Sequence, residues 1–238
     1  MPGIGVGIGL KFGLGSGEDA LRALSPDGMW DARSSYTDAG ATIPVSTTGD
    51  LAYVISDLSG NGRHWSQATS TKRASLVTGA NPYLSFDGLD DFYAASGAAL
   101  DNTVSTVAAA FMLNSGASSR LLVSIEKQAL YAQGTSVAVW GGYNGKDLGS
   151  GYAASTDTAA IMVSRNYNDV DFYTNGNAVV NNIQGTAYNA RVRYLGGYST
   201  TQFANMRFYR MAIWLRELNS TGIATARTWL GQGMGLSL

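Results

Sequence analysis

Residues 55–65 read Ile-Ser-Asp-Leu-Ser-Gly-Asn-Gly-Arg-His-Trp, and residues 84–93 read Leu-Ser-Phe-Asp-Gly-Leu-Asp-Asp-Phe-Tyr. In each stretch a short apolar run meets Asp and Gly residues, and the first stretch adds Asn61. Glycine accepts positive φ, and Asp and Asn side chains bond their own backbone, so each stretch predicts a strand that ends in a tight turn. We therefore expect two strand-to-turn corners, with the rest of the chain arranged around them.

The rest of the chain is rich in short apolar segments at the spacing of an antiparallel sandwich. Thr103–Leu113 has no polar alternation and predicts a buried central strand. Asn175-Gly176 separates two apolar runs, the strongest hairpin signal in the sequence. The apolar register shifts near Tyr209-Arg210, which predicts a β-bulge. Further strands are expected at residues 120–126, 136–140, 159–166, 169–174, 191–196 and 205–215.

Two helices are expected outside these strands. A short helical turn is predicted for residues 18–24, before Ser-Pro at 25–26. The chain should close with a helix in which Asn219 is the N-cap, Leu218 and Ile223 form a hydrophobic staple, and Gly231 is the C-cap.

Several of these segments together resemble the laminin-G-like, concanavalin-A-like jelly-roll domains of secreted lectin-like proteins and bacteriophage virion proteins. The resemblance rests on Asp-Leu-Ser-Gly-Asn-Gly at 57–62, on Phe-Asp-Gly-Leu-Asp-Asp at 86–91 with an aromatic residue after it, and on the closing strand and helix from residue 213. It covers roughly Met29 to Leu230. It implies an all-β fold, an antiparallel two-sheet jelly-roll sandwich with a short C-terminal helix.

Composition excludes several classes of function. The chain has 238 residues, long enough for one large sandwich, and 16 Lys and Arg against 17 Asp and Glu give it no basic footprint for nucleic acid or an anionic membrane. It has no Cys, so disulfides and thiolate chemistry are absent. No apolar run approaches 18 residues and the N-terminus lacks a basic region, so we expect neither membrane insertion nor a signal peptide.

Residues 1–17 form a distinct segment before the predicted sandwich domain, residues 18–238. Its even positions are apolar and its odd positions are nearly all Gly, a strict period of two. Such a segment exposes an apolar edge unless it is paired or buried, so we interpret it as an extended arm that docks during assembly, with a loose tail as the alternative. The docking residues are Ile4, Val6, Ile8, Leu10, Phe12 and Leu14.

Catalytic groups are sparse. Retaining glycoside hydrolysis needs two carboxylates about 5–5.5 Å apart, most simply on alternate positions of one strand. Asp169 and Asp171 alternate, but we interpret them as a solvated strand face. His64 is the only histidine, and one His without Cys makes neither a catalytic triad nor a transition-metal site. We expect no catalytic residues, no cofactor and no enzymatic activity.

Two kinds of ligand site stay open in the sequence. Asp87, Asp90 and Asp91 fall within five residues and are a weak calcium candidate. We favour the alternative that Asp87 and Asp90 cap their own turns while Asp91 faces water. Sugars need an aromatic platform with amide or carboxylate groups beside it. The stretch 140–147 offers that set in Trp140, Tyr143, Asn144 and Asp147.

The function most consistent with the arm, the missing catalytic groups and the resemblance is a structural protein of a bacteriophage virion. The arm would bind other virion proteins and the sandwich would project outward, with a homotrimer as the favoured assembly. The alternatives are a lectin-like module that binds a cell-surface glycan or receptor, and a polysaccharide-degrading enzyme.

Overall fold

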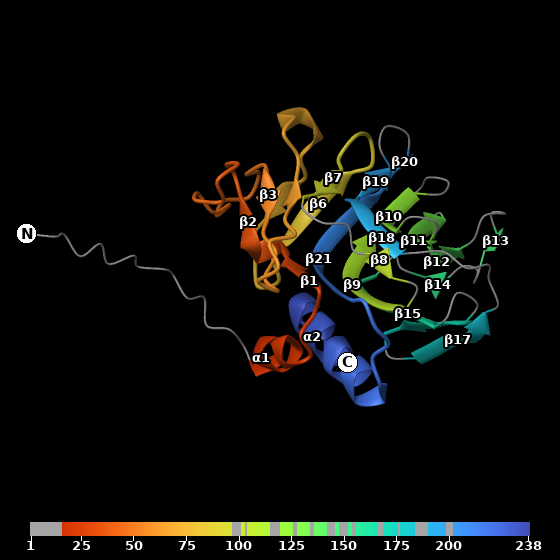
Figure 1. Ribbon diagram of the computed structural model, residues 1–238. Helices are drawn as coiled ribbons and strands as arrows, with labels where there is room; N and C mark the ends of the chain where they lie inside the picture. Colours follow the sequence, from red (N-terminus) through yellow and green to blue (C-terminus); the bar gives the residue numbers. More distant parts are fainter. Residues whose placement is uncertain are drawn as a thin grey trace, which may run out of the picture.

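The longest strand of the computed structural model, β21 (Asn205–Trp214), lies at the centre of the molecule (Figure 1). One of its edges pairs with β9, and its other edge pairs first with β6 and then with β1. The structure describes residues 16–96, 101–102, 104–114, 120–125, 128–133, 136–141, 146–147, 152–153, 156–165, 169–175, 177–183, 190–198 and 202–238.

Within the described residues, the first sheet, called sheet A here, has eight antiparallel strands, and β21 is one of them. In spatial order its members are β17 (Asn177–Ile183), β16 (Asp169–Thr174), β15 (Thr158–Arg165), β9 (Ser105–Leu113), β21, β6 (Tyr83–Asp87) and β5 (Ser75–Val77), with β1 (Gly28–Asp31) also on β21.

The second sheet, sheet B, has eleven antiparallel strands in the part of the chain that the structure describes. In spatial order its members are β13 (Lys146–Asp147), β12 (Ser136–Gly141), β11 (Gln128–Gln133), β10 (Arg120–Ile125), β18 (Ala190–Leu195), β7 (Tyr93–Ala95), β4 (Trp65–Ser66), β3 (Val54–Ile55) and β2 (Ser35–Tyr36), with β14 (Tyr152–Ala153) on β12 and β8 (Asp101–Asn102) on β18. A separate two-stranded ribbon joins β19 (Gly197–Tyr198) and β20 (Gln202–Phe203).

Helices α1 (Ser16–Ala23) and α2 (Ser220–Met234) add a third layer on sheet A. Two 3-10 turns, η1 (Ala32–Ser34) and η2 (Ser70–Lys72), complete the described elements. The protein is thus an antiparallel two-sheet sandwich of lectin-like type with a short C-terminal helix, as the sequence predicts. Neither described helix is long and apolar enough to cross a bilayer.

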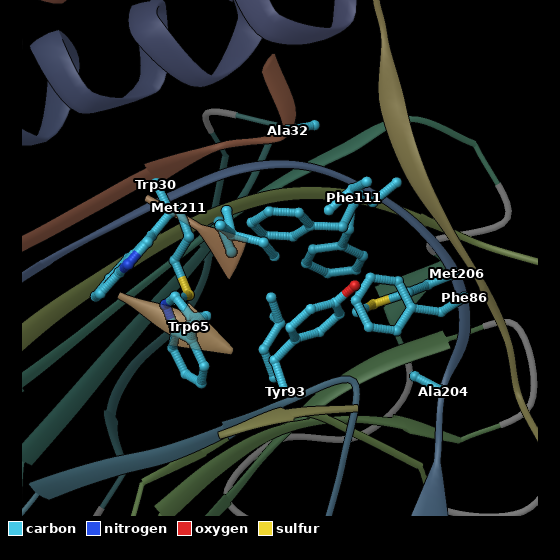
Figure 2. Packing of buried hydrophobic residues seen from close by; sticks show 14 of the residues in the cluster. Trp30, Ala32, Trp65, Phe86, Tyr93, Phe111, Ala204, Met206 and Met211 are labelled. Atoms are coloured by element: carbon cyan, nitrogen blue, oxygen red, sulfur yellow. The ribbon is translucent and has the colours of Figure 1, made fainter. Parts of the chain in front are cut away.

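The space between the two sheets is filled by an apolar cluster rich in aromatic rings, which takes the place of disulfides as the source of stability (Figure 2). Trp30 and Trp65 meet edge to face with ring centroids 5.3 Å apart, and Phe86 and Tyr93 do so at 5.7 Å. The Tyr93 hydroxyl donates to the Ala52 carbonyl at 2.7 Å, so its polar end is satisfied inside the core. Trp65 and Tyr93 close the two stretches that the sequence marks as corners.

A second apolar cluster lies between sheet A and the helices. Successive residues of β9 alternate between the two clusters, because side chains along a strand point to opposite faces. Ala108 and Ala110 face the helices, where their small size lets α2 approach the sheet, while Val107 and Phe111 face sheet B. The predicted central strand is therefore confirmed.

The predicted bulge in β21 is also confirmed. Phe208 lies opposite Phe111, but Arg210 lies opposite Ala110, so Tyr209 is the extra residue. Tyr209 joins the helix-side cluster and the Arg210 side chain reaches Trp229 of α2. The bulge therefore keeps a charged side chain out of the sandwich core.

Local turn and cap signals are mostly confirmed. Asn175 has φ of 46° in the two-residue connection between β16 and β17, where Thr174 pairs with Asn177. Asn219 is the N-cap of α2, because its Oδ1 accepts the Gly222 N–H at 2.8 Å.

The predicted C-cap at Gly231 is wrong. The helix continues to Met234, and Gly235 caps it with φ of 73°. Gly231 has a different role: a Cβ at this position would lie 2.6 Å from the carbonyl oxygen of Leu236, so only Gly lets the C-terminal segment fold back onto α2.

Candidate functional site

The corner after β3 is a structural joint built around one buried carboxylate. Oδ1 of Asp57 accepts the N–H of Met29 at 3.0 Å, and Oδ2 accepts the N–H of Arg63 at 3.0 Å. The Nδ1 atom of His64 accepts the N–H of Asp57 at 3.1 Å. These contacts tie the corner to β1, so His64 has a structural role.

The turn after β6 brings three carboxylates together. The ligand atoms of Asp87, Asp90 and Asp91 lie within 4.8 Å of one another. Oδ1 of Asp87 accepts the N–H of Leu89 at 2.7 Å and of Asp90 at 3.3 Å, and Oδ2 of Asp91 accepts the N–H of Asp87 at 2.9 Å. Asp87 therefore caps the backbone of its own turn, as expected. The expectation that Asp91 faces water is wrong, because Asp91 is buried and also caps the turn.

Asp91 is the chemically unusual member of this cluster. Its side chain is buried, and burial together with the charges of Asp87 and Asp90 raises its pKa to about 6. A carboxyl with such a pKa resembles a general acid, but Asp91 is only 5% exposed and cannot reach a substrate from the surface. We interpret Asp91 as a structural residue of the turn, whose charged form is destabilised by burial and by the charges of Asp87 and Asp90.

A second group of charges is buried between sheet A and the helices, and sequence reasoning missed it. Nη2 of Arg210 lies 2.9 Å from Oδ2 of Asp31, and both side chains are 5% exposed. Arg33 adds bonds of 2.8 and 2.7 Å to the same carboxylate. Burial alone would raise the pKa of Asp31, but the bonds from Arg33 and the charge of Arg210 outweigh it and lower that pKa. This network joins β1 to β21, and Arg33 is its one partly exposed member among the three side chains.

The expected solvated strand face on β16 is wrong for Asp171. That side chain is buried, and the hydroxyl of Tyr173 donates to its Oδ2 at 3.4 Å. The reason is that Tyr173, two residues further along the same face, packs beside the helix-side cluster and covers the carboxylate. The side chain of Asp169 lies outside the described set.

The predicted sugar-binding stretch is a hairpin at the edge of sheet B. Trp140 of β12 and Asp147 of β13 are direct register partners, followed by Gly141 and Lys146. The fold thus brings an aromatic residue and a carboxylate residue of the predicted set to opposite positions. Tyr143 and Asn144, in the connection between them, lie outside the described residues.

The predicted arm also lies mostly outside the described residues, including all six of its apolar docking positions. Helix α1 begins at Ser16, slightly before the expected end of the arm. It is fixed to the body, because a Cβ on Gly17 would meet the side chain of Gln232 and because Arg22 donates to the Leu58 carbonyl.

No protein-family model and no curated protein sequence matches the chain. Solved structures do match it. The sialidase of Trypanosoma rangeli in complex with sialic acid superposes with a TM-score of 0.55 at 13% identity, over 89% of this chain and 33% of the sialidase.

Two toxin domains superpose as well. The binding domain of Paraclostridial mosquitocidal protein 1 gives a TM-score of 0.55 at 13% identity, over 76% of this chain and 50% of that one. The ligand-binding domain of botulinum neurotoxin serotype D, in complex with N-acetylneuraminic acid, gives 0.57 at 10% identity, over 87% and 52%. The chain thus spans between a third and about half of these structures, and the likeness shows a shared lectin-like sandwich fold.

Proposed function

We propose that this chain is a non-enzymatic, lectin-like carbohydrate-binding module. The observation that carries the proposal is the direct pairing of Trp140 with Asp147 at the edge of sheet B. Directly opposite residues in an antiparallel pair have Cβ atoms about 5 Å apart, so the pairing places an aromatic residue and a carboxylate residue side by side. The likeness to the sialic acid complexes supports the proposal through the fold that they share.

Four of the carboxylates that the structure describes already have structural partners, which favours binding over hydrolysis. Asp57 and Asp87 bond backbone N–H groups, and Asp31 is held by two arginines. Asp91 has the raised pKa of an acid but is buried in its own turn. Each of these groups already has a structural role, so none is offered to a sugar ring at the surface.

The virion role stays a prediction of the sequence. It depends on residues 1–17, and the apolar positions of that segment lie outside the described residues. Light scattering on the full chain, compared with a chain that begins at Ser16, tests whether the segment drives assembly into a homo-oligomer.

The test of glycan binding is an array of immobilised glycans probed with the intact protein, followed by titration of the best hit. Asp147→Asn should weaken binding about tenfold or more, because a hydrogen bond to a charged acceptor contributes about 1.5–3 kcal/mol. Asp19→Asn is the matched control, since Asp19 is exposed on α1. An array without any hit, measured on folded protein, would remove the proposal.

A further inference from the structure

The strand register of sheet B places several residues that are distant in sequence in one row. Tyr194 pairs with Ser124, Ser124 with Ala129, Ala129 with Trp140, and Trp140 with Asp147. The row crosses β18, β10, β11, β12 and β13. Because directly opposite residues of an antiparallel sheet share a face, these five positions belong to one face of sheet B.

The neighbouring row identifies which face this is. Leu195 pairs with Val123, Val123 with Leu130, and Leu130 with Val139, so this second row is apolar throughout. Leu195 belongs to the cluster between the two sheets. Successive residues along a strand alternate between faces, so the row that contains Trp140 is on the face turned away from sheet A.

That outward face holds three aromatic positions around small residues. Tyr131 is opposite Ala138 on this face, two residues along β11 from Ala129 and therefore diagonal to Trp140. Tyr194 and Trp140 are separated by three strand spacings, about 14 Å. Both helices pack on sheet A, at the other side of the sandwich (Figure 1).

Charge limits what this face can bind. On β10, β11 and β12 no position that shares the face with Tyr131 and Trp140 carries a charge, and Asp147 on β13 adds a single acidic residue. Two basic residues adjoin the row without belonging to it: Lys146, next to Asp147 and opposite Gly141, and Arg193, at the register shift between Tyr194 and Val192. An acidic sugar such as sialic acid would meet Asp147 without a matching cation in the row, whereas an uncharged sugar meets stacking surfaces and one hydrogen-bond acceptor.

We propose that the outward face of β18, β10, β11 and β12 binds an uncharged linear oligosaccharide laid across the strands, from Trp140 towards Tyr194. The proposal rests on the carbohydrate-binding function and adds the position, length and charge class of the ligand. A span of about 14 Å exceeds one sugar ring, so affinity should rise with chain length. The platform extends the hairpin edge that holds Asp147 into a surface several strands wide.

The experiment measures binding of the intact protein to neutral linear oligosaccharides of increasing length and to sialylated glycans. We expect neutral chains to bind, with affinity rising until the chain covers the platform. Trp140→Ala and Tyr131→Ala should each weaken binding about tenfold, since each removes an aromatic stacking surface. Tyr36→Ala is the matched control, because Tyr36 is a half-buried tyrosine on β2 at the opposite edge of the same sheet.

The outcomes separate this proposal from the function on which it rests. If a glycan binds both alanine variants as tightly as the wild type, the proposed platform is wrong but carbohydrate binding stands. The same conclusion follows if only sialylated glycans bind. No binding by any folded protein overturns both. Trp140→Phe keeps an aromatic ring and should retain most of the binding. If Trp140→Ala loses affinity while Trp140→Phe does not, and the thermal unfolding of both is unchanged, the loss is assigned to stacking.

Discussion

Removing either partner of the buried ion pair between Asp31 and Arg210 should have very unequal effects on stability. Asp31 accepts from two arginines, because Arg33 bonds it as well as Arg210. Arg210 has fewer alternatives: Nη1 donates to the Trp229 carbonyl at 2.8 Å, its guanidinium lies 4.8 Å from the Trp229 ring centre, and Nε has no partner within the described structure. The guanidinium thus depends on Asp31 for its counter-charge.

The expected magnitudes follow from what each substitution leaves behind. Asp31→Asn leaves a buried cation without a counter-charge, which should lower the free energy of unfolding by about 3–5 kcal/mol. Arg210→Met leaves Asp31 with Arg33 and removes the desolvated cation, so the expected loss is about 2 kcal/mol. Arg33→Gln removes a partner whose side chain is 46% exposed, and should cost about 1 kcal/mol.

Urea unfolding of the three variants at neutral pH tests the order Asp31→Asn, Arg210→Met, Arg33→Gln. The largest loss corresponds to a fall in melting temperature of about 10 °C for a chain of this size. The folded-state pKa of Asp31 is lowered, so its contribution is complete above the ordinary Asp range and fades as the pH falls below about 4. An Arg210→Met variant as destabilised as Asp31→Asn, or a gap between wild type and Asp31→Asn that widens in acid, would refute the reasoning.

Three further substitutions test other features of the fold. The raised pKa of Asp91, about 6, means that folding favours its neutral form, a contribution that is complete below about pH 4 and lost as the pH rises through 6. Asp91→Asn should therefore be more stable than wild type at pH 7.5 by up to about 3 kcal/mol and equal to it near pH 4, and a constant gap in urea titrations would contradict this. Gly231→Ala should lower the free energy of unfolding by about 1–3 kcal/mol, because the added Cβ meets the Leu236 carbonyl, and this outweighs the better helix propensity of Ala. Thr228→Ala, on the exposed side of α2, is the control and should leave thermal unfolding unchanged. Asn219→Ala should cost about 1 kcal/mol through loss of the N-cap bond, with Ser220→Ala as the neutral neighbour, and equal melting temperatures would exclude the cap.

Features that depend on neighbouring residues could be predicted from the sequence. The turn at Asn175 needs a residue that accepts positive φ, and Asn219 bonds the backbone of its own helix, so a few neighbouring residues are enough to predict both features. The bulge at Tyr209 was visible because the apolar register breaks there.

Features that depend on contacts distant in sequence could not be predicted. Asp31 and Arg210 meet only because β1 pairs with the second half of β21. The sequence around either residue does not indicate that the other is its partner. Gly231 is the residue type expected at a helix C-cap. Its actual role is to leave room for the C-terminal segment, which folds back over the helix. Only part of the candidate site could be predicted from the sequence. Trp140 and Asp147 are close in sequence, but Tyr194 joins their row only through the order of the strands in sheet B.

We infer that the two sheets divide stability and the proposed binding between them. Sheet A carries the bulge, the buried ion pair and both helices, so its outer face is occupied by structural contacts. Sheet B shares the sandwich core, and its other face is where the register gathers Tyr131, Trp140 and Tyr194. Substitutions on that face should change binding with little change in unfolding, and substitutions at Asp31 should do the reverse. Because the two sets act on different sheets, a variant that combines Trp140→Ala with Asp31→Asn should show additive effects on each property.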